Sequence, residues 1–114
     1  MDWPNLIKNA SARVAPYIRQ TPIVTFETGT LASHVALNLE QLQHAGSFKT
    51  RGAFNTLLGT APPAAGLVAA SGGNHGAAVA YAAQRLGFPA RVYVPEIAGP
   101  AKISLIRACG ADLQ

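Results

Sequence analysis

The sequence predicts an α/β protein in which a parallel sheet is covered by helices on both faces, a three-layer arrangement. In the second half of the chain, short apolar runs suited to buried strands alternate with longer runs at helical spacing. The connections between these runs are short, which is typical of parallel βαβ units. Because a parallel sheet is normally buried on both faces, we expect helices above and below it.

The first expected element is an amphipathic helix over 5–15, where apolar side chains stand at helical spacing and Pro16 falls near the end. A strand is expected over 23–26. A second strand is expected over 35–40, where apolar and polar residues alternate. The stretch 28–34 between them is ambiguous and could form one helical turn.

A helix is expected from 47 to 58, with Ser47 as its N-cap. A loop rich in Pro and Gly then leads to a short apolar strand over 66–70. The glycine-rich segment 71–76 follows this strand. After it, an alanine-rich helix is expected over 77–87, where a glycine stops it.

The chain continues with an expected strand over 90–95 and a helix over 99–110. Pro100 suits the first turn of that helix, and Gly110 suits its end. Residues 111–113 read as the start of a further strand, where the sequence stops. This ending indicates a chain truncated at its C-terminus.

The composition of the 114 residues fits one small folded domain, with 49% apolar and 12% charged residues. So few charges suggest that more protein covers part of the surface. The net charge is +4, but the basic residues are scattered singly, which argues against nucleic-acid binding.

Localisation can be inferred from three absences in the sequence. A single cysteine, Cys109, excludes an internal disulfide framework and fits a reducing compartment. The N-terminus has no apolar core of a secretory signal. No apolar run approaches the ~20 residues that span a bilayer. We therefore expect a cytoplasmic protein that does not associate with membranes.

The segment SGGNHG, residues 71–76, lies between an expected strand and an expected helix. Glycines let the backbone approach a ligand closely, and a helix start offers unpaired N–H groups to an anion. The segment matches neither the GxGxxG dinucleotide fingerprint nor a P-loop. It therefore predicts a cradle for a phosphate or carboxylate, with an ordinary β–α turn as the equally open alternative.

The segment GSFKTRGAF, residues 46–54, places Lys49 at an expected helix start. A cation is mildly unfavourable there because the helix dipole is positive at this end. Either Lys49 is a solvated surface residue, or its amine does chemistry as a nucleophile. Phe48 beside it could lay an aromatic face against a bound ring.

Taken together, QLQHAGSFKTRGAFNTLL and the following ASGGNHGAAVAYAAQRLGFPARVYVPEIAGPAKISLIRACGADL resemble the pyridoxal-phosphate enzymes of the tryptophan synthase β-like fold, fold type II. Within that superfamily they look most like threonine/serine dehydratases and their serine-racemase relatives. Sulfhydrylase and threonine-synthase relatives usually carry Thr where this chain has His75. They also commonly carry Asp where this chain has Thr50.

The resemblance implies a domain division. Residues 1–40 would form an N-terminal segment that belongs to a larger domain. Residues 41–114 would form the smaller, cofactor-side domain, truncated at its C-terminus. The glycine-rich loop that holds the cofactor phosphate would lie beyond Gln114, as would the side chain that faces the pyridine nitrogen. The isolated chain is therefore expected to be inactive and, with apolar surface uncovered, prone to associate.

The resemblance also implies roles for individual residues, with pyridoxal 5′-phosphate as the cofactor and no metal. Lys49 would be the catalytic residue, which binds the cofactor covalently and then removes the substrate's α-proton. Phe48 would pack near the cofactor ring, and Asn74 would hydrogen-bond the cofactor's 3′-oxygen. The substrate carboxylate would be received by the loop made of Ser71, Gly72, Gly73, Asn74, His75 and Gly76.

Gly72 narrows the implied reaction, because racemases of this group carry a second catalytic serine at that position. The chain is therefore expected to serve β-elimination, which turns serine or threonine into a 2-oxo acid and ammonia in a complete protein. That protein would be a homo-oligomer acting on a small amino acid. Two alternatives stay open: an ammonia-lyase for another β-hydroxy amino acid, and a non-catalytic βαβ module that binds an anion or a partner.

Overall fold

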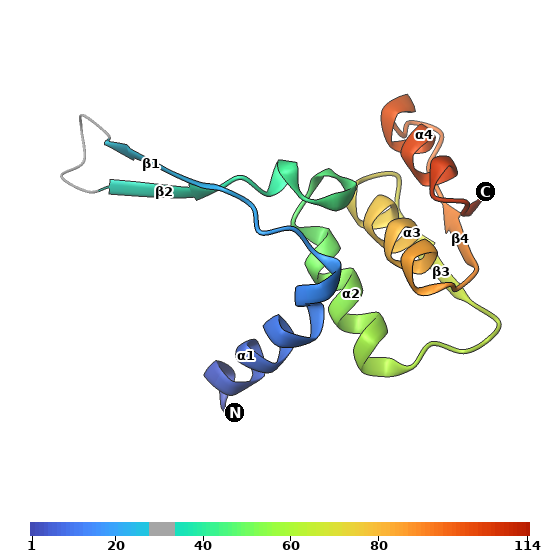
Figure 1. Cartoon of the computed structure of the whole chain (residues 1–114). Coiled ribbons are helices and arrows are strands. Elements are labelled where there is room, and N and C mark those ends of the chain that lie inside the picture. The colour runs from blue at the N-terminus through green and yellow to red at the C-terminus, as the bar shows by residue number, and fades with distance from the viewer. Residues whose placement is uncertain (28–33) are drawn as a thin grey trace.

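The computed structural model describes residues 1–27 and 34–114. Along the chain, a first helix is followed by a two-stranded hairpin, then by a second helix, and then by a βαβαβ unit (Figure 1). Their bounds are α1 Trp3–Val14, β1 Ile23–Glu27, β2 His34–Asn38, α2 Lys49–Thr60, β3 Leu67–Ala70, α3 Asn74–Leu86, β4 Ala90–Tyr93, α4 Pro100–Ala108 and β5 Asp112–Leu113. Three short 3-10 turns, η1 Ala15–Tyr17, η2 Glu40–Leu42 and η3 His44–Gly46, connect them.

The second half of the chain forms the expected parallel sheet, in the order β3-β4-β5. Leu67 lies opposite Ala90 in the first pair of strands, and Arg91 lies opposite Asp112 in the second. Helix α3 connects β3 to β4, and α4 connects β4 to β5. The prediction of parallel βαβ units is therefore confirmed.

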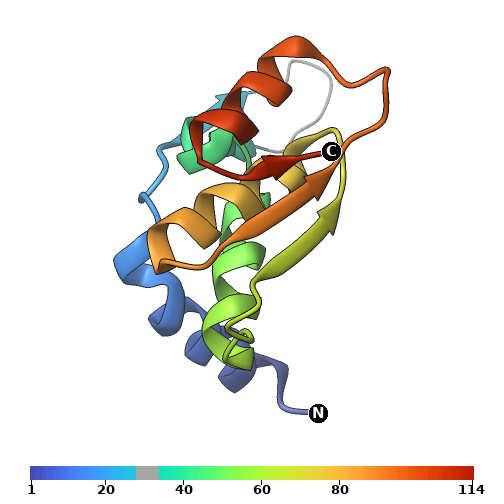
Figure 2. The same ribbon diagram turned by 90° about the vertical axis from the view of Figure 1, so that its right-hand side faces the viewer.

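The helices α3 and α4 cover the same face of this sheet. Ala69 and Val92 on that face are buried in one cluster with residues of both helices. On the opposite face, Val68 is 73% exposed and Tyr93 is 47% exposed. The described residues thus supply two of the three expected layers, and the second face of the sheet is bare (Figure 2).

Helix α2 lies between α1 and α3, and its buried side chains form a second core cluster. Phe54 is fully buried there, with Tyr17 stacked on its ring at 5.0 Å between centroids and Tyr81 edge-on at 6.1 Å. Val14 of α1 packs into the same cluster. Residues before and after position 40 thus share this core, and the domain division at that position stays a prediction.

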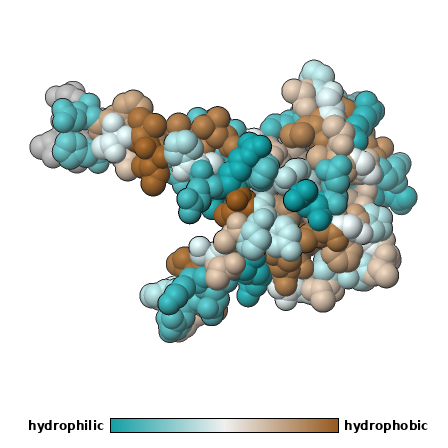
Figure 3. Space-filling model, viewed as in Figure 1, coloured by the Kyte–Doolittle hydropathy of each residue, from teal (hydrophilic) through white to brown (hydrophobic). Residues whose placement is uncertain are grey.

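The antiparallel hairpin of β1 and β2 extends away from the helices as an arm (Figure 1). The molecule measures 51 × 36 × 23 Å, and its radius of gyration is 16.3 Å, against about 13 Å for a compact chain of this length. Apolar side chains on the arm are exposed, among them Ile23 at 66%, Phe26 at 49% and Leu37 at 47% (Figure 3).

Helix α1 begins at Trp3, two residues before the expected start. The carboxylate of Asp2 accepts a hydrogen bond from the backbone N–H of Asn5 at 3.3 Å and caps the helix. Pro4 lies in the first turn, where its missing N–H costs nothing. The amphipathic pattern located this helix, while its start depends on the cap.

Strand β2 ends at Asn38, before the expected residue 40, because the chain turns there into η2. Of the ambiguous stretch 28–34, His34 begins β2 and residues 28–33 lie outside the described residues. The remaining expected helices and strands are present, with ends shifted by a few residues. No helix among the described residues is both long and apolar enough to cross a membrane.

Candidate functional site

Helices α2 and α3 begin at the same end of the molecule (Figures 1 and 2). Lys49 is the first residue of α2, and Asn74 is the first residue of α3. Only three residues separate Asn74 from the carboxyl end of β3, so this edge of the sheet and both helix starts lie together. Ligands commonly bind at the carboxyl ends of strands in α/β sheets. The two motifs singled out in the sequence therefore meet at one end of the fold.

The side chain of Lys49 is exposed, and neither of the ion pairs within residues 1–27 and 34–114 involves it. Its Nζ lies 5.2 Å from the centroid of the Phe48 ring, within range of a cation–π contact. Phe48 itself is 58% exposed. An accessible amine and an accessible aromatic face thus stand side by side.

Ser47 was expected to cap α2, and that prediction is wrong. The capping position is taken by Phe48, and no side chain caps the helix there. Ser47 is 5% exposed, and its buried hydroxyl has no hydrogen-bond partner among residues 1–27 and 34–114. The backbone makes the first helical bond instead, from Thr50 N to the Ser47 carbonyl at 3.4 Å. Ser47 is therefore directed into the protein rather than along the helix start.

The glycine-rich segment is shorter as a loop than the sequence predicted. Helix α3 already includes Asn74, His75 and Gly76, and its first turn closes through a bond from Ala77 N to the Gly73 carbonyl at 3.2 Å. Ser71 Oγ accepts a hydrogen bond from Gly73 N at 3.2 Å. The N–H groups of the first helical turn have no partner within the helix, which is the geometry that anions use.

Two glycines of this segment lie against other backbone or side-chain atoms. A Cβ added to Gly72 would stand 2.7 Å from Ala98 Cβ and 2.8 Å from Pro95 Cδ. A Cβ added to Gly76 would collide with the Ser71 carbonyl oxygen. By contrast, a Cβ at Gly73 would meet nothing within 4 Å, so the loop is open at that point. The loop is thus closely packed at Gly72 and Gly76 and open at Gly73.

Behind Lys49, an ion pair that the sequence did not reveal connects α2 to η2. Arg51 donates from Nε to Glu40 Oε2 at 2.9 Å and from Nη2 to Glu40 Oε1 at 2.6 Å. Thr21 also donates to the Glu40 carboxylate. The hydrogen bonds from Arg51 hold the pKa of Glu40 below its ordinary value, although partial burial opposes this. They also raise the pKa of Arg51.

The turn η3 before Lys49 is held by contacts from two directions. The His44 ring stacks on Tyr81 of α3, with centroids 4.9 Å apart and 17° between the planes. The Thr50 hydroxyl donates to the His44 carbonyl. Burial lowers the pKa of His44, and the charges of Arg19 and Arg85 add to this effect. The turn therefore connects the start of α2 to the body of α3.

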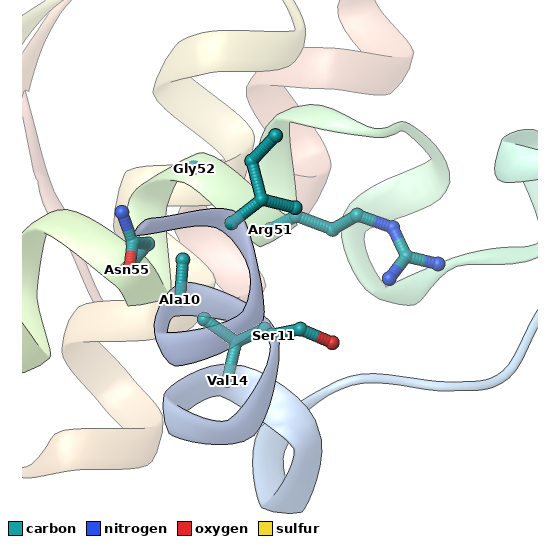
Figure 4. A pocket seen from close by; sticks show the side chains of 7 residues that line it. Ala10, Ser11, Val14, Arg51, Gly52 and Asn55 are labelled. Atoms are coloured by element: carbon teal, nitrogen blue, oxygen red, sulfur yellow. The ribbon is translucent and has the colours of Figure 1, made fainter. Parts of the chain in front are cut away.

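A groove of about 310 Å³ lies between α1 and α2 (Figure 4). Its lining is mostly apolar and does not include Lys49. The residues around it are Ile7, Ala10, Ser11, Val14, Arg51, Gly52 and Asn55. The groove therefore reaches the first turn of α2, but neither Lys49 nor the start of α3 is among its lining residues.

These residues fit a cofactor that carries an aldehyde, an aromatic ring and an anionic group. Lys49 offers an exposed primary amine, and Phe48 offers an aromatic face. The start of α3 offers N–H groups and the exposed amide of Asn74. In the described part of the chain, no three His, Cys, Asp or Glu side chains are grouped to hold a metal ion.

Comparison with known proteins agrees with this chemistry. A family model described as pyridoxal-phosphate dependent enzyme matches residues 14–114. The phenylserine dehydratase of Ralstonia pickettii is 41% identical over 111 residues, which are 94% of this chain and 34% of that protein.

Two solved structures have the same fold. A threonine deaminase from T.th. has a TM-score of 0.82 at 43% identity, over 95% of this chain and 35% of that one. Maize serine racemase has a TM-score of 0.86 at 34% identity, over 96% of this chain and 35% of that one. The chain thus spans about a third of the length of the relatives it matches, and the expected tryptophan synthase β-like fold is confirmed for that part.

Proposed function

Because the chain belongs to the family of pyridoxal-phosphate-dependent enzymes, we propose that the protein carrying it performs β-elimination on serine or threonine, releasing a 2-oxo acid and ammonia. The observation that carries this proposal is the shared position of two helix starts, which brings Lys49 and Asn74 to one end of the fold. The similarity to a threonine deaminase supports the substrate class.

Lys49 is the catalytic residue in this proposal. Its amine is exposed and would hold the cofactor through the cofactor's aldehyde carbon. The same amine, when free, would accept the substrate's α-proton. When bound, the cofactor's ring supplies an electron sink for the charge left at the α-carbon. Overall, the α-proton and the β-hydroxyl would leave as water, and hydrolysis of the enamine product by one water would give the 2-oxo acid and ammonia.

Three further contributions come from this chain. The Phe48 ring would pack near the cofactor ring. The Asn74 amide would hydrogen-bond the cofactor's 3′-oxygen. The substrate carboxylate is received by N–H groups of the segment from Ser71 to Gly76, at the positive end of the α3 dipole. These groups orient the substrate so that its α-proton faces Lys49.

Gly72 supports elimination over racemisation. Racemisation needs an acid/base group on each face of the planar carbanion, and glycine supplies none. Although maize serine racemase is similar in fold, this chain keeps Gly72 packed against Pro95 and Ala98. A second candidate reaction is elimination from another β-hydroxy amino acid, which the 41% identity to a phenylserine dehydratase favours.

The complete protein is proposed to be a cytoplasmic homo-oligomer in which residues 1–40 belong to a larger domain and residues 41–114 to a smaller one. The free, buried Cys109 supports a reducing compartment. Exposed apolar side chains on the hairpin and on the bare sheet face support the proposal that further protein covers these two surfaces. Residues 1–114 alone are proposed to be inactive, because covalent attachment at Lys49 does not by itself fix the ring and phosphate.

The test is 2-oxo acid release by the full-length protein supplied with pyridoxal phosphate and serine, threonine or phenylserine in turn. We expect turnover of at least one of these, with a loss of more than about a thousandfold in Lys49→Ala, because both the attachment point and the base are removed. Lys8→Ala, on exposed α1, is the matched control and should keep full activity. Turnover that survives in Lys49→Ala, or racemisation without 2-oxo acid, would contradict the proposal.

A further inference from the structure

Gln43 is a polar residue that is only 2% exposed, and it lies six residues before Lys49. Within the described part of the chain, its amide makes three hydrogen bonds. Oε1 accepts from Arg19 N at 2.9 Å and from His44 N at 3.0 Å, and Nε2 donates to the Arg19 carbonyl at 2.8 Å. A primary amide offers two donor hydrogens and two acceptor sites, so three of its four possibilities are used.

These bonds connect two segments that are distant in sequence. Arg19 follows the 3-10 turn after α1, and both of its backbone polar groups pair with the one Gln43 amide. The side chain thus pairs with the backbone of Arg19 as a neighbouring strand would. Because the amide is buried, removing it leaves the Arg19 N–H and carbonyl without this partner in a place with little access to water.

The turn that follows Gln43 adopts a backbone conformation that its sequence does not favour. Ala45 has φ 57° and Gly46 has φ 72°. The left-handed region disfavours alanine because its Cβ crowds the following carbonyl. The turn closes through its own hydrogen bond, from Gly46 N to the Gln43 backbone carbonyl at 2.9 Å, and it depends in addition on contacts from outside, such as the stacking of His44 on Tyr81.

The same turn determines where α2 starts. Thr50 in the first turn of α2 donates its hydroxyl to the His44 carbonyl, so both ends of the stretch 44–50 are joined. Lys49 lies inside this closed stretch, and no side chain caps the helix. The direction of Lys49 is thus determined by a short loop that the Gln43 amide holds in place.

We propose that Gln43 is a positioning residue for Lys49: its buried amide ties the turn before α2 to Arg19 and thereby fixes the point from which the lysine amine reaches the cofactor. The inference rests on the proposed role of Lys49. Gln43 itself touches neither cofactor nor substrate. A displacement of about 1 Å at a reacting group can lower the rate about a hundredfold. The hydrogen bonds of Gln43 are therefore expected to affect the rate of the reaction.

The test compares Gln43→Met, which keeps the length of the side chain and loses all three hydrogen bonds, with Ile106→Val. Ile106 is fully buried on α4, in the cluster against which Ala45 of the turn packs, so its variant lowers stability while it keeps every hydrogen bond of Gln43. The full-length protein is mixed with pyridoxal phosphate, and the product is fixed with borohydride. The labelling measured at Lys49 is then divided by the labelling measured at Lys8 and Lys102 in the same molecule. Measurements are made well below the unfolding temperature of every variant.

We expect the ratio of labelling at Lys49 to labelling at Lys8 and Lys102 (the Lys49 share) to fall about tenfold in Gln43→Met. In Ile106→Val the Lys49 share should stay at the wild-type value. In the full-length enzyme, kcat should fall while KM for the amino acid changes little, since the substrate loop is untouched. Equal Lys49 shares in the two variants would show that Gln43 only stabilises the fold and would overturn the inference.

A second measurement separates this inference from the proposed function. Trypsin cleavage after Lys49, relative to cleavage after Arg107, is followed without any cofactor. A cleavage ratio at least about tenfold higher in Gln43→Met than in Ile106→Val supports the tie, and equal ratios overturn it. If the wild type shows no preferential labelling at Lys49, the proposed function fails, and the trypsin ratio still decides the role of Gln43.

Discussion

The spacing of Lys49 and Arg51 follows from the geometry of the helix that carries them. Successive residues of an α-helix are about 100° apart, so residues two positions apart point in nearly opposite directions. Lys49 is accordingly exposed, while Arg51 turns back to Glu40 and forms two hydrogen bonds with it. One residue is available for chemistry, and the other anchors the first turn of α2.

The pair of Glu40 and Arg51 makes stability depend on pH. The pKa of Glu40 lies below its ordinary value of 4.5, so the carboxylate contributes stability that is fully present above pH 4.5 and is lost as pH falls through the folded-state pKa. Since the Arg51 side chain is 37% exposed, solvent screens the pair, and we expect about 1 kcal/mol at most. Glu40→Gln should remove this contribution in chemical unfolding between about pH 3 and 7, a range chosen to span the titration of the carboxyl.

The matched control is Asp112→Asn, which breaks the ion pair with Arg91 in a more exposed place, with side chains 53% and 47% exposed. That variant should leave the free energy of unfolding and its pH dependence nearly unchanged. If the free energy of unfolding depended on pH in the same way in both variants, the role assigned to the pair of Glu40 and Arg51 would be contradicted.

At the scale of the elements, one glycine ends a helix, and another lies inside a helix where alanine would increase the free energy of unfolding. Gly87 follows α3 with φ 77°, and its N–H donates to the Ala83 and Gln84 carbonyls. Gly52 lies within α2, is exposed, and has nothing within 4 Å of an added Cβ. The same substitution should therefore have opposite effects at the two positions.

We expect Gly87→Ala to lower the free energy of unfolding by about 1 kcal/mol, because alanine disfavours the left-handed conformation. Gly52→Ala should raise it by about 0.5–1 kcal/mol, because alanine favours the helix interior. Urea unfolding of both variants at one pH measures the difference. Changes of the same sign would argue against these helix bounds.

The elements themselves could largely be predicted from the sequence, because their signals are local. The apolar run at 66–70, the glycine after α3 and Pro100 at the start of α4 each specify a nearby backbone conformation. Helix starts were less predictable. Ser47 has the right chemistry for a cap, but its hydroxyl is buried instead, and α3 begins three residues earlier than its pattern indicated.

The supports of the candidate site could not be predicted, because they join residues that are distant in sequence. Arg19 and Gln43 are 24 positions apart, and the ring of His44 stacks on Tyr81 of another helix. No spacing rule connects such positions before the chain has folded. The motif around Lys49 could be recognised locally, whereas the contacts that hold it depend on tertiary structure.

At the scale of the whole molecule, two surfaces outside α1 gather exposed apolar side chains. One is the hairpin arm with Ile23, Phe26 and Leu37, and the other is the bare sheet face with Val68 and Tyr93. A parallel sheet is normally covered on both faces, and an isolated two-stranded hairpin is marginally stable in water. Both surfaces thus have the character of interfaces.

We therefore expect the 114-residue chain to associate as its concentration rises. Replacing Ile23 and Leu37 by Thr keeps the preference for strands and lowers the apolar area, so it should shift sedimentation toward the monomer. Gln84→Lys, at an exposed polar position of α3, is the control and should sediment as the wild type does. A wild-type chain that stays monomeric at every concentration would contradict this view of the two surfaces.

Lys49, at the start of α2, is the residue that we propose to bond to pyridoxal phosphate, and the proposed reaction depends on it. The most direct measurement is peptide mass mapping after borohydride fixation of the full-length protein loaded with the cofactor. Most of the cofactor mass is expected on the peptide containing Lys49, with far less on Lys8 and Lys102, and this signal should disappear in Lys49→Ala. A cofactor mass on another lysine, with Lys49 unmodified, would contradict this proposal.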